Sequence, residues 1–422
     1  MAYSKHILMN NNTIYKDSPL GKIPSDWDVS KLDNLGEFKN GINKDKAEFG
    51  HGYPLVGLMD VFNVPKVYNS NFSLVNTTDN ERRDFDLKIG DVLFVRSSVK
   101  PVGVGLTSLI CENIPDATFS GFLIRFRNNK KLDFEFKAHC FLESNFRQRL
   151  LNKSTISANT NINQVALKSL QIILPPLSEQ TRIAEVLSAW DKAISNVQGT
   201  IEQVELRNKW LMQELLTGKK RLKGFDGEWK RIHIHEVAKE VSIRNKDNKQ
   251  LTVLSCTKYN GLVDSLEYWG RQIFSEDIST YKIVPKNHFA YATNHIEEGS
   301  IGYQSTLVEA LISPMYTVFK TDKCVNDEYF FKLLKSHRLI YEYNARMEGS
   351  IDRRGGLRWD AFSILKINLP SLEEQTAIAQ VLQAAANEVQ VLSSKLDKLK
   401  EQKKGLMQVL LTGKKRLNVN SI

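Results

Sequence analysis

Apolar residues recur alternately every three and four positions in two long segments of the chain. This heptad pattern is typical of helices that pair along an apolar seam. The seam residues of the first segment are Ile183, Leu187, Trp190, Ile194, Val197, Ile201, Val204, Leu211 and Leu215. Those of the second segment are Ile378, Leu382, Ala385, Val389, Leu392, Leu396, Leu399, Leu406 and Leu410. The pattern therefore predicts two long helices that pair with each other.

The two seams share an interruption and an ending. A polar residue stands at the same seam position in each segment, Asn208 in the first and Lys403 in the second. A polar residue at such a position specifies helix register at some cost in stability. Each segment then ends at a Thr-Gly pair, and a glycine just past a helix is a common C-cap. We expect the first helix to run from about Glu179 to Thr217.

The two segments are copies of one repeat. Residues 174–222 align without a gap on residues 369–417 and are identical at 23 of 49 positions. Outside this repeat the two halves align only locally, as at ATFSGFLIRF and ALISPMYTVF. A tryptophan stands near the start of each variable segment, Trp27 in the first and Trp229 in the second. The chain is therefore predicted to alternate between segments that differ in the two halves (variable) and segments that are repeated (fixed), in the order variable, fixed, variable, fixed. The expected bounds are 1–156, 157–222, 223–350 and 351–422.

The variable segments combine short apolar runs typical of strands with amphipathic stretches typical of helices. We therefore expect a mixed α/β (α+β) fold with two globular domains. Strands are predicted at 88–96, 121–127, 167–174, 250–256 and 365–369, and helical pieces at 134–151 and 327–347.

Charge favours a polyanionic partner, because the 422-residue chain carries a net charge of +10. Two Lys-Lys-Arg clusters, at 219–221 and 414–416, supply six of the ten excess charges; gripping phosphate and capping a helix C-terminus explain them equally well. The N-terminal residues lack the apolar stretch of a signal peptide, and no run is long enough to span a bilayer. Four widely spaced cysteines indicate neither a zinc site nor a disulfide framework. A cytoplasmic location is expected.

The motifs LPPLSEQTRIAEVL and LPSLEEQTAIAQVL, each followed by LLTGKKRL, and the entry residues Trp27 and Trp229 resemble the specificity (S) subunit of type I restriction-modification systems. The resemblance covers nearly the whole chain. It implies that each variable segment is a target recognition domain that reads one half of a split site in double-stranded DNA. It also implies that the long helices pair antiparallel, set the spacer between the half-sites and dock two modification subunits.

The resemblance further implies that this chain carries no cofactor and is not itself an enzyme. The modification subunits would transfer methyl groups from S-adenosylmethionine to adenine, and a restriction subunit, where present, would use ATP and Mg. Independently of the family, two different readers on a rigid pair of helices would see two short sequences at a fixed separation. Because the two variable domains differ, the DNA site is expected to be asymmetric.

Two other function classes are open to a chain of this composition, a self-sufficient Mg-dependent nuclease and a coiled-coil scaffold protein. Asp116, Glu135 and Lys137 have the order of a PD-(D/E)xK nuclease, but the D/E-x-K triplet occurs at least six times and a nuclease core leaves the repeat unexplained. Methyltransferase and nucleotide-binding motifs are missing. His233 and His235 alternate with isoleucines as in a half-exposed strand rather than a metal site. No catalytic or metal-binding residue is predicted.

Loops that mix cations, amides and glycine are the best candidates for DNA contact, because these side chains donate to phosphates and base edges. In the first variable domain the candidates are Lys39, Asn40, Asn43, Lys44, Arg96, Ser97, Ser98, Lys100, Asn159, Asn161 and Asn163. In the second they are Arg244, Asn245, Lys246, Asn294, His295, Arg353, Arg354 and Arg358. The repeat offset of 195 places Asn163 against Arg358.

Overall fold

The computed structural model of the protein describes residues 13–129, 131–348 and 356–417. The chain divides into two compact units, one made of Met1–Gln198 and Lys395–Ile422 and the other of Gly199–Ser394. Each unit therefore holds one variable domain together with a part of each long helix. Within the described ranges, no helix combines the length and the apolar character that crossing a membrane requires.

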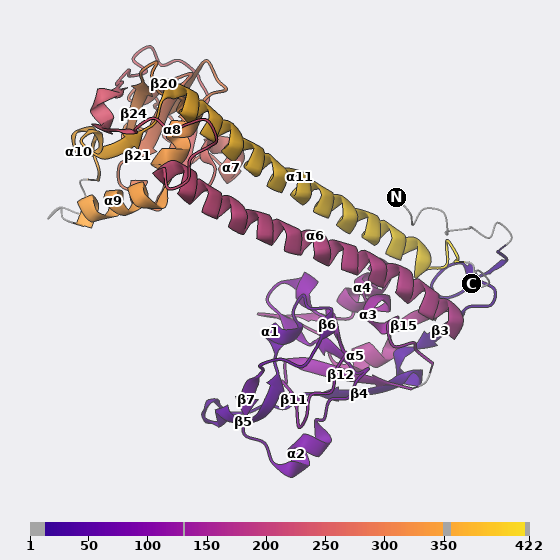
Figure 1. The fold of residues 1–422 in the computed structure, drawn as a ribbon. Coiled ribbons are helices and arrows are strands. Elements are labelled where there is room, and N and C mark those ends of the chain that lie inside the picture. The colour runs from indigo at the N-terminus through magenta and orange to yellow at the C-terminus, as the bar shows by residue number, and fades with distance from the viewer. Residues whose placement is uncertain (1–12, 130, 349–355, 418–422) are drawn as a thin grey trace. The chain divides into compact units, whose positions relative to one another are not determined.

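Both predicted long helices are present, as α6 (Leu177–Thr217) and α11 (Leu372–Leu410) (Figure 1). Every seam residue named above is buried or half-buried. Gly218 and Gly413 follow the helices with φ of 70° and 71°, the left-handed conformation of a C-cap glycine. The sequence pattern thus located both helices and their ends.

The helices run antiparallel within each unit, and the polar seam residues join them. In the first unit Lys403 forms an ion pair with Asp191. In the second unit Asn208 Nδ2 donates to the carbonyl of Ala385 at 2.7 Å. Both residues thus satisfy their polar groups across the seam, as expected for residues that specify register.

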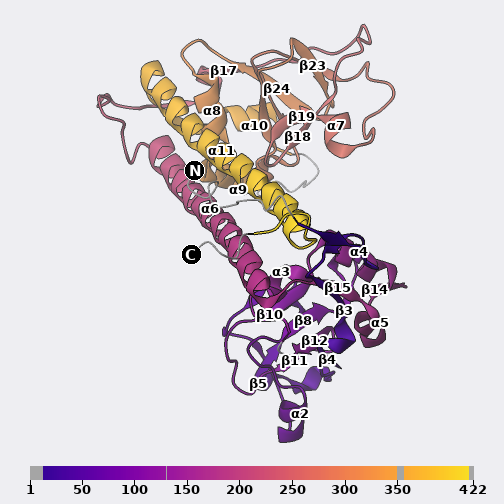
Figure 2. The same ribbon diagram turned by 90° about the vertical axis from the view of Figure 1, so that its right-hand side faces the viewer.

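The first variable domain is built on the five-stranded sheet β4-β12-β8-β10-β6, with smaller sheets β11-β5-β7, β13-β14-β9, β15-β3 and β1-β2 around it (Figure 2). The strands are β1 (Tyr15–Lys16), β2 (Ile23–Pro24), β3 (Asp28–Lys31), β4 (Gly36–Asn40), β5 (Phe49–Val56), β6 (Lys66–Val67), β7 (Ser73–Val75), β8 (Val92–Val95), β9 (Ser97–Ser98), β10 (Thr107–Ile110), β11 (Thr118–Phe119), β12 (Leu123–Asn128), β13 (Thr155–Ile156), β14 (Thr160–Asn161) and β15 (Gln171–Leu174). The helices are α1 (Leu58–Val61), α2 (Asp79–Asp84), α3 (Lys137–Cys140), α4 (Ser144–Asn152) and α5 (Gln164–Ser169).

The core of the first domain is continuous with the helix pair. Phe94, Phe126 and Phe141 are fully buried and their rings pack together at centroid distances of 5.1 to 6.5 Å. The same apolar cluster includes Leu187 of α6 and Leu410 of α11. Because one core spans the sheet and both helices, the first domain is fixed to its part of the helix pair.

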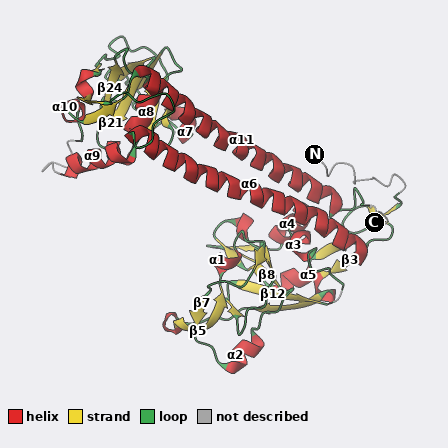
Figure 3. Cartoon of the chain, viewed as in Figure 1, coloured by secondary structure: helices red, strands yellow, loops and turns green. Residues whose placement is uncertain are grey.

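The second variable domain is built on the four-stranded sheet β17-β24-β21-β22, with the two-stranded sheets β16-β25, β18-β19 and β20-β23 (Figure 3). Its strands are β16 (Lys230–His233), β17 (Ala238–Glu240), β18 (Leu254–Thr257), β19 (Gly261–Asp264), β20 (Lys282–Pro285), β21 (His288–Ala292), β22 (Ile301–Gln304), β23 (Glu309–Ile312), β24 (Tyr316–Thr321) and β25 (Lys366–Leu369). Its helices are α7 (Ser265–Trp269), α8 (Asp327–Leu334), α9 (His337–Glu348) and α10 (Trp359–Ser363). Its core again includes residues of both long helices, among them Leu215 and Leu382.

The internal repeat extends into the variable domains, where the two sequences align only locally. Strands β3 and β15 of the first domain pair antiparallel, and β16 and β25 pair in the same way in the second. The central strand order β4-β12-β8 corresponds to β17-β24-β21. The two-domain α/β fold with an internal repeat is confirmed.

Several element boundaries differ from the sequence prediction. Residues 167–174, predicted as one strand, begin within α5 and become strand only at Gln171, because the Asn163 side chain accepts from the amide of Ala166 and starts a helix there. The helical stretch 134–151 is divided at Glu143, whose carboxylate caps α4. The stretch 327–347 is divided between α8 and α9. Strand β18 covers only the end of the predicted strand 250–256.

Candidate nucleic-acid interface

In the first variable domain, three segments that are distant in sequence meet at the end of β8. The amide of Ile162 donates to the Arg96 carbonyl at 3.0 Å, and the Arg96 amide donates to the Phe122 carbonyl at 2.8 Å. Strand β9 pairs with β14, so the candidates Ser97 and Asn161 lie opposite each other. The candidate loops at 96–100 and 159–163 therefore form one surface.

The segment after β4 joins the same surface by close backbone packing. A Cβ added to Gly41 would lie 2.1 Å from the Ser120 carbonyl oxygen, and one added to Gly121 would lie 1.9 Å from Asn43 Oδ1. Position 41 therefore needs glycine, because the obstacle is backbone, whereas at position 121 the obstacle is the Asn43 side chain. The candidates Asn40 and Asn43 are thereby held beside the turn at 120–123.

Not every candidate in the first domain is available for DNA. Lys44 Nζ lies 2.9 Å from carboxylate oxygens of Glu48 and Glu81, and its hydrogen bond to Glu81 raises the Lys44 pKa. Its charge is already balanced, so we leave it out of the proposed contacts. Asn163 is occupied as the cap of α5. Of the other candidates, Asn43, Lys100 and Asn159 are exposed, whereas Ser98 is buried and we leave it out of the proposed contacts.

The second domain has a matching junction at the end of β21. The amide of Leu357 donates to the Thr293 carbonyl at 2.8 Å, and Thr293 Oγ1 donates to the Met315 carbonyl at 3.0 Å. The exposed candidates Asn294 and His295 follow Thr293, and the exposed Arg358 follows Leu357. Two of the loops predicted for this domain are thus brought together. Arg353 and Arg354 lie outside the described residues.

The third predicted loop of the second domain, residues 244–246, contains one residue whose role is structural. The Asn245 side chain is 1% exposed and bonds to backbone groups of Lys249 and Ile278, so it shapes the loop and we leave it out of the proposed contacts. Arg244 and Lys246 on either side of it are exposed. Arg244 forms a backbone bridge with Lys282 at the start of β20, not with the junction at Thr293.

Sequence reasoning found the motif at the start of each long helix but not what its glutamate binds. Glu179 is 1% exposed and its Oε2 accepts from Trp27 Nε1 at 2.8 Å and from Arg416 Nη2 at 2.6 Å. Glu374 is the counterpart, 2% exposed, with Trp229 Nε1 at 3.1 Å and Arg221 Nη2 at 2.7 Å. We call each set of tryptophan, glutamate and arginine a clamp.

The clamps divide the Lys-Lys-Arg clusters by role. The arginine of each cluster binds a buried glutamate, whereas the four lysines remain exposed. Only the lysines are therefore available for phosphate. The signal for the clamps is present in the sequence, since tryptophan, glutamate and arginine all recur at matching places of the two halves.

The glutamine after each clamp glutamate attaches the variable domain. Gln180 Oε1 accepts from the amide of Asp133 at 2.9 Å, and Gln375 Oε1 accepts from the amide of Asn326 at 2.8 Å. Their Nε2 atoms donate to the carbonyls of Pro175 and Pro370 in the turns that start the helices. The fixed motif thus binds backbone atoms of both variable domains.

The residues of the nuclease-like motif are engaged in structural contacts. Glu135 pairs with Lys66 at 2.6 Å, and Lys137, 4% exposed, donates to the Gly90 carbonyl at 2.5 Å. Asp116 lies 3.9 Å from Arg82 in an ion pair of its own. His233 ends strand β16, as predicted, whereas His235 lies in the 3-10 helix Ile234–Glu236, so the predicted strand is shorter than expected.

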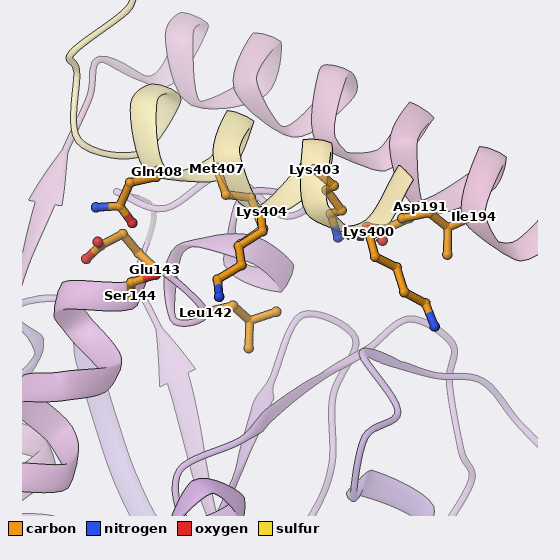
Figure 4. Close-up of a pocket in the computed structure, with 10 residues that line it drawn as sticks. All are labelled: Leu142, Glu143, Ser144, Asp191, Ile194, Lys400, Lys403, Lys404, Met407 and Gln408. Atoms are coloured by element: carbon orange, nitrogen blue, oxygen red, sulfur yellow. Dashed lines mark hydrogen bonds and ion pairs between the residues drawn. The ribbon is translucent and has the colours of Figure 1, made fainter. Parts of the chain in front are cut away.

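One pocket, of about 410 Å³, lies between the start of α4 and the two long helices (Figure 4). Figure 4 shows Lys404 extending from α11 toward Leu142, while Lys403 turns to Asp191. Within the described part of the chain, Lys400 and Lys404 have no carboxylate within 4.0 Å. The lining residues are Leu142, Glu143, Ser144, Asp191, Ile194, Lys400, Lys403, Lys404, Met407 and Gln408. The lining thus combines three apolar side chains, Leu142, Ile194 and Met407, with polar residues that include Lys400 and Lys404.

Comparison with known proteins matches residues 24–206 to the type I restriction modification DNA specificity domain. A protein of Methanocaldococcus jannaschii, assigned as the MjaX specificity subunit of a type I restriction enzyme, is 26% identical over 434 residues, which cover 96% of this chain and 97% of the relative.

Solved structures share the fold at low sequence identity. The type I restriction-modification S subunit from M. genitalium matches with a TM-score of 0.51 at 15% identity, covering 95% of this chain and 97% of its own. A chain from a structural study of complex assembly and conformational transition of the type I R-M system matches with a TM-score of 0.60 at 15% identity. The match covers 93% of this chain and 99% of the other.

Proposed function

Because this chain belongs to the specificity subunits of type I restriction-modification systems, which recognise DNA and are not catalytic, we propose that its two variable domains read the two halves of one split site. The observation that carries the proposal is the repeated junction. Arg96, Phe122 and Ile162 occupy the same places in the first domain as Thr293, Met315 and Leu357 in the second. The framework is therefore shared while the exposed side chains differ, as two readers of different sequences require.

The proposed contacts are exposed or half-exposed polar side chains of the two junctions and of the other candidate loops. Backbone hydrogen bonds hold these loops at Arg96, Ile162 and Leu357, and the Arg96 and Asn161 side chains add bonds to the carbonyls of Gly121 and Asn159. Cations and amides on such a surface can donate to phosphates and to base edges. The residues we propose are Lys39, Asn40, Asn43, Arg96, Ser97, Lys100, Asn159 and Asn161 in the first domain, and Arg244, Lys246, Asn294, His295 and Arg358 in the second.

We propose that α6 and α11 set the spacer and dock two modification subunits. The unpaired Lys400 and Lys404 beside apolar Leu142 and Met407 suit an acidic segment with an apolar anchor, so the pocket of Figure 4 is a candidate docking point. S-adenosylmethionine would be bound by the modification subunits, and ATP and Mg by a restriction subunit where one is present. Free cysteines at all four positions fit a cytoplasmic location.

The test is base-resolved mapping of adenine methylation in cells that express the modification subunit with and without this chain. Methylation at one split motif should depend on the chain. Replacing residues 229–350 by the corresponding domain of a relative should change one half of the motif and leave the other. A motif that changes in both halves would contradict the two-reader proposal.

The catalytic alternative has its own test. The purified chain with Mg²⁺ should cleave no DNA, and the Glu135→Ala variant should behave in the same way. Cleavage by the chain that is lost in Glu135→Ala would support a nuclease instead. A coiled-coil scaffold would show no sequence preference when DNA is pulled down with the chain.

A further inference from the structure

Both readers expose one large apolar side chain at the same point of their junctions. Phe122 is 58% exposed and Met315 is 62% exposed. The two residues occupy the third position of equivalent turns, in which the amide of Leu123 donates to the Ser120 carbonyl at 2.9 Å and the amide of Tyr316 donates to the Ser313 carbonyl at 3.0 Å. Each turn leads directly into a buried strand, β12 or β24.

The backbone of each exposed residue is bound while its side chain is left in water. The Phe122 carbonyl accepts from the Arg96 amide, and the Met315 carbonyl accepts from Thr293 Oγ1. Arg96 in turn accepts a hydrogen bond from the amide of Ile162, and Thr293 accepts one from the amide of Leu357. Three segments therefore fix the position of one apolar side chain in each domain.

Polar side chains lie at both junctions, together with the exposed Val99 in the first. Arg96 and Ser97 lie at the junction with Phe122, and Thr293 and Asn294 at the junction with Met315. An apolar side chain contributes nothing to phosphate binding. It does read bases, by contact with the thymine methyl group in the major groove or by insertion between base steps.

We propose that Phe122 and Met315 are the apolar base-contacting residues of the two readers, one in each half-site. The proposal rests on the function proposed above and adds a specificity-determining residue to each domain. Polar neighbours would hold the backbone of the DNA, and the apolar side chain would meet a base. Each residue acts on one half-site, because each belongs to one domain.

The experiment uses the full chain expressed with its modification subunit and base-resolved methylation mapping. Phe122→Ala should reduce methylation at the wild-type sites at least about tenfold, or relax one position of one half of the motif, and leave the other half unchanged. Met315→Ala should do the same for the opposite half. Phe122→Leu, which keeps an apolar side chain, should retain more of the specificity than Phe122→Ala.

Matched controls are exposed apolar residues placed away from the two junctions. Ile89 is 56% exposed and precedes β8, at the opposite end of that strand from Arg96. Val308 is 82% exposed and precedes β23, at the opposite end of that strand from Met315. Ile89→Ala and Val308→Ala should keep the wild-type motif and methylation level. An unchanged motif and level in Phe122→Ala and Met315→Ala, or an equal loss in both halves, would overturn the proposal.

Modified duplexes identify the kind of contact. Replacing thymine by uracil at each position of a half-site removes only the methyl group. Weakened binding of the wild-type complex, with no further loss in the alanine variant, indicates methyl contact. Unchanged binding together with an alanine defect indicates insertion between bases. A wild-type chain that directs no split-motif methylation would contradict the proposed function itself, a result distinct from failure of the two variants.

Discussion

Arg416 donates two hydrogen bonds to the buried carboxylate of Glu179, which precedes it by 237 residues. The end of the second fixed segment thus holds the start of the first long helix. The reverse exchange occurs in the other clamp, where Arg221 of the first fixed segment binds Glu374 of the second. Each fixed segment therefore completes the other.

Substitution of the clamp glutamate should destabilise the protein. Glu179→Gln removes the charge that Arg416 and Trp27 both face in a buried site. Removing one partner of a buried pair is costly, and Arg416 is partly exposed, so we expect a loss of about 2–4 kcal/mol in the free energy of unfolding. Urea denaturation measures it. Asp26→Asn, which alters the exposed ion pair of the same arginine, is the control and should cost less than about 1 kcal/mol.

A core substitution in the seam should lower the free energy of unfolding strongly, and a surface substitution elsewhere on the same helix should change it little. Leu187 is fully buried in the core shared by the first domain and the helices. Leu187→Ala should reduce the free energy of unfolding by about 2–5 kcal/mol. Leu206, 62% exposed on the same helix, provides the control, and Leu206→Ala should change it by less than about 0.5 kcal/mol. Equal effects would mean that the seam is placed incorrectly.

The stability of the protein should fall as the pH decreases below about 6.5. Burial, with smaller effects of Lys403 and Lys66, lowers the pKa of His139 to about 3. In the unfolded chain histidine titrates near pH 6.5, so between these values the unfolded state binds the additional proton and is favoured. The free energy of unfolding should be about 2 kcal/mol lower at pH 5 than at pH 7.5 from this group alone.

The His139 contribution can be isolated by substitution. In His139→Gln the free energy of unfolding should differ between pH 5 and pH 7.5 by about 2 kcal/mol less than in the wild type. Urea denaturation at the two pH values measures this difference. His51→Gln, on an exposed side chain, should leave the difference unchanged. A wild-type pH dependence in His139→Gln would show that another group is responsible.

Lengthening both helices should lengthen the DNA spacer. Four residues inserted after Gly199 of α6 and four after Ser394 of α11 add about 6 Å to each helix and nearly one full turn. Gly199 is suitable because an added Cβ there meets no atom within 4 Å. Methylation mapping should show both half-sequences retained and a spacer longer by about one or two base pairs. An unchanged spacer at full activity would mean that the helices do not measure it.

The pocket lysines should matter for assembly rather than for DNA specificity. Lys400→Glu with Lys404→Glu places two negative charges where an acidic partner segment is proposed, so the mass of the complex with modification subunits should fall in light scattering. Lys398→Glu, outside the pocket lining, is the control. Wild-type assembly of the double variant would remove the pocket from the proposed docking surface.

The long helices could be predicted because their signal is local and periodic. The side chains that meet along α6 and α11 recur every three or four residues, so the sequence itself displays the contact surface. The same holds for Gly218 and Gly413, whose position after Thr already indicates a C-cap. The break between α8 and α9 was missed because the apolar pattern continues across it.

The candidate contacts were predicted less well, because polar side chains serve both structure and recognition. Lys44 and Asn245 have the residue types of a DNA-binding loop, yet one balances two carboxylates and the other bonds to its own loop. Their partners lie up to 37 residues away, so composition alone does not reveal the difference. Phe122 and Met315 were overlooked for the opposite reason, since an apolar residue beside a strand is normally assigned to the core.

The glutamines of the two fixed motifs have an evolutionary consequence. Gln180 and Gln375 hold the variable domains through the main chain, by the amides of Asp133 and Asn326 and the carbonyls of Lys131 and Cys324. Main-chain groups are the same whatever residue supplies them. A foreign domain that arrives by recombination would therefore find these glutamine contacts unchanged, and only the apolar side chains that it packs against the long helices would have to match.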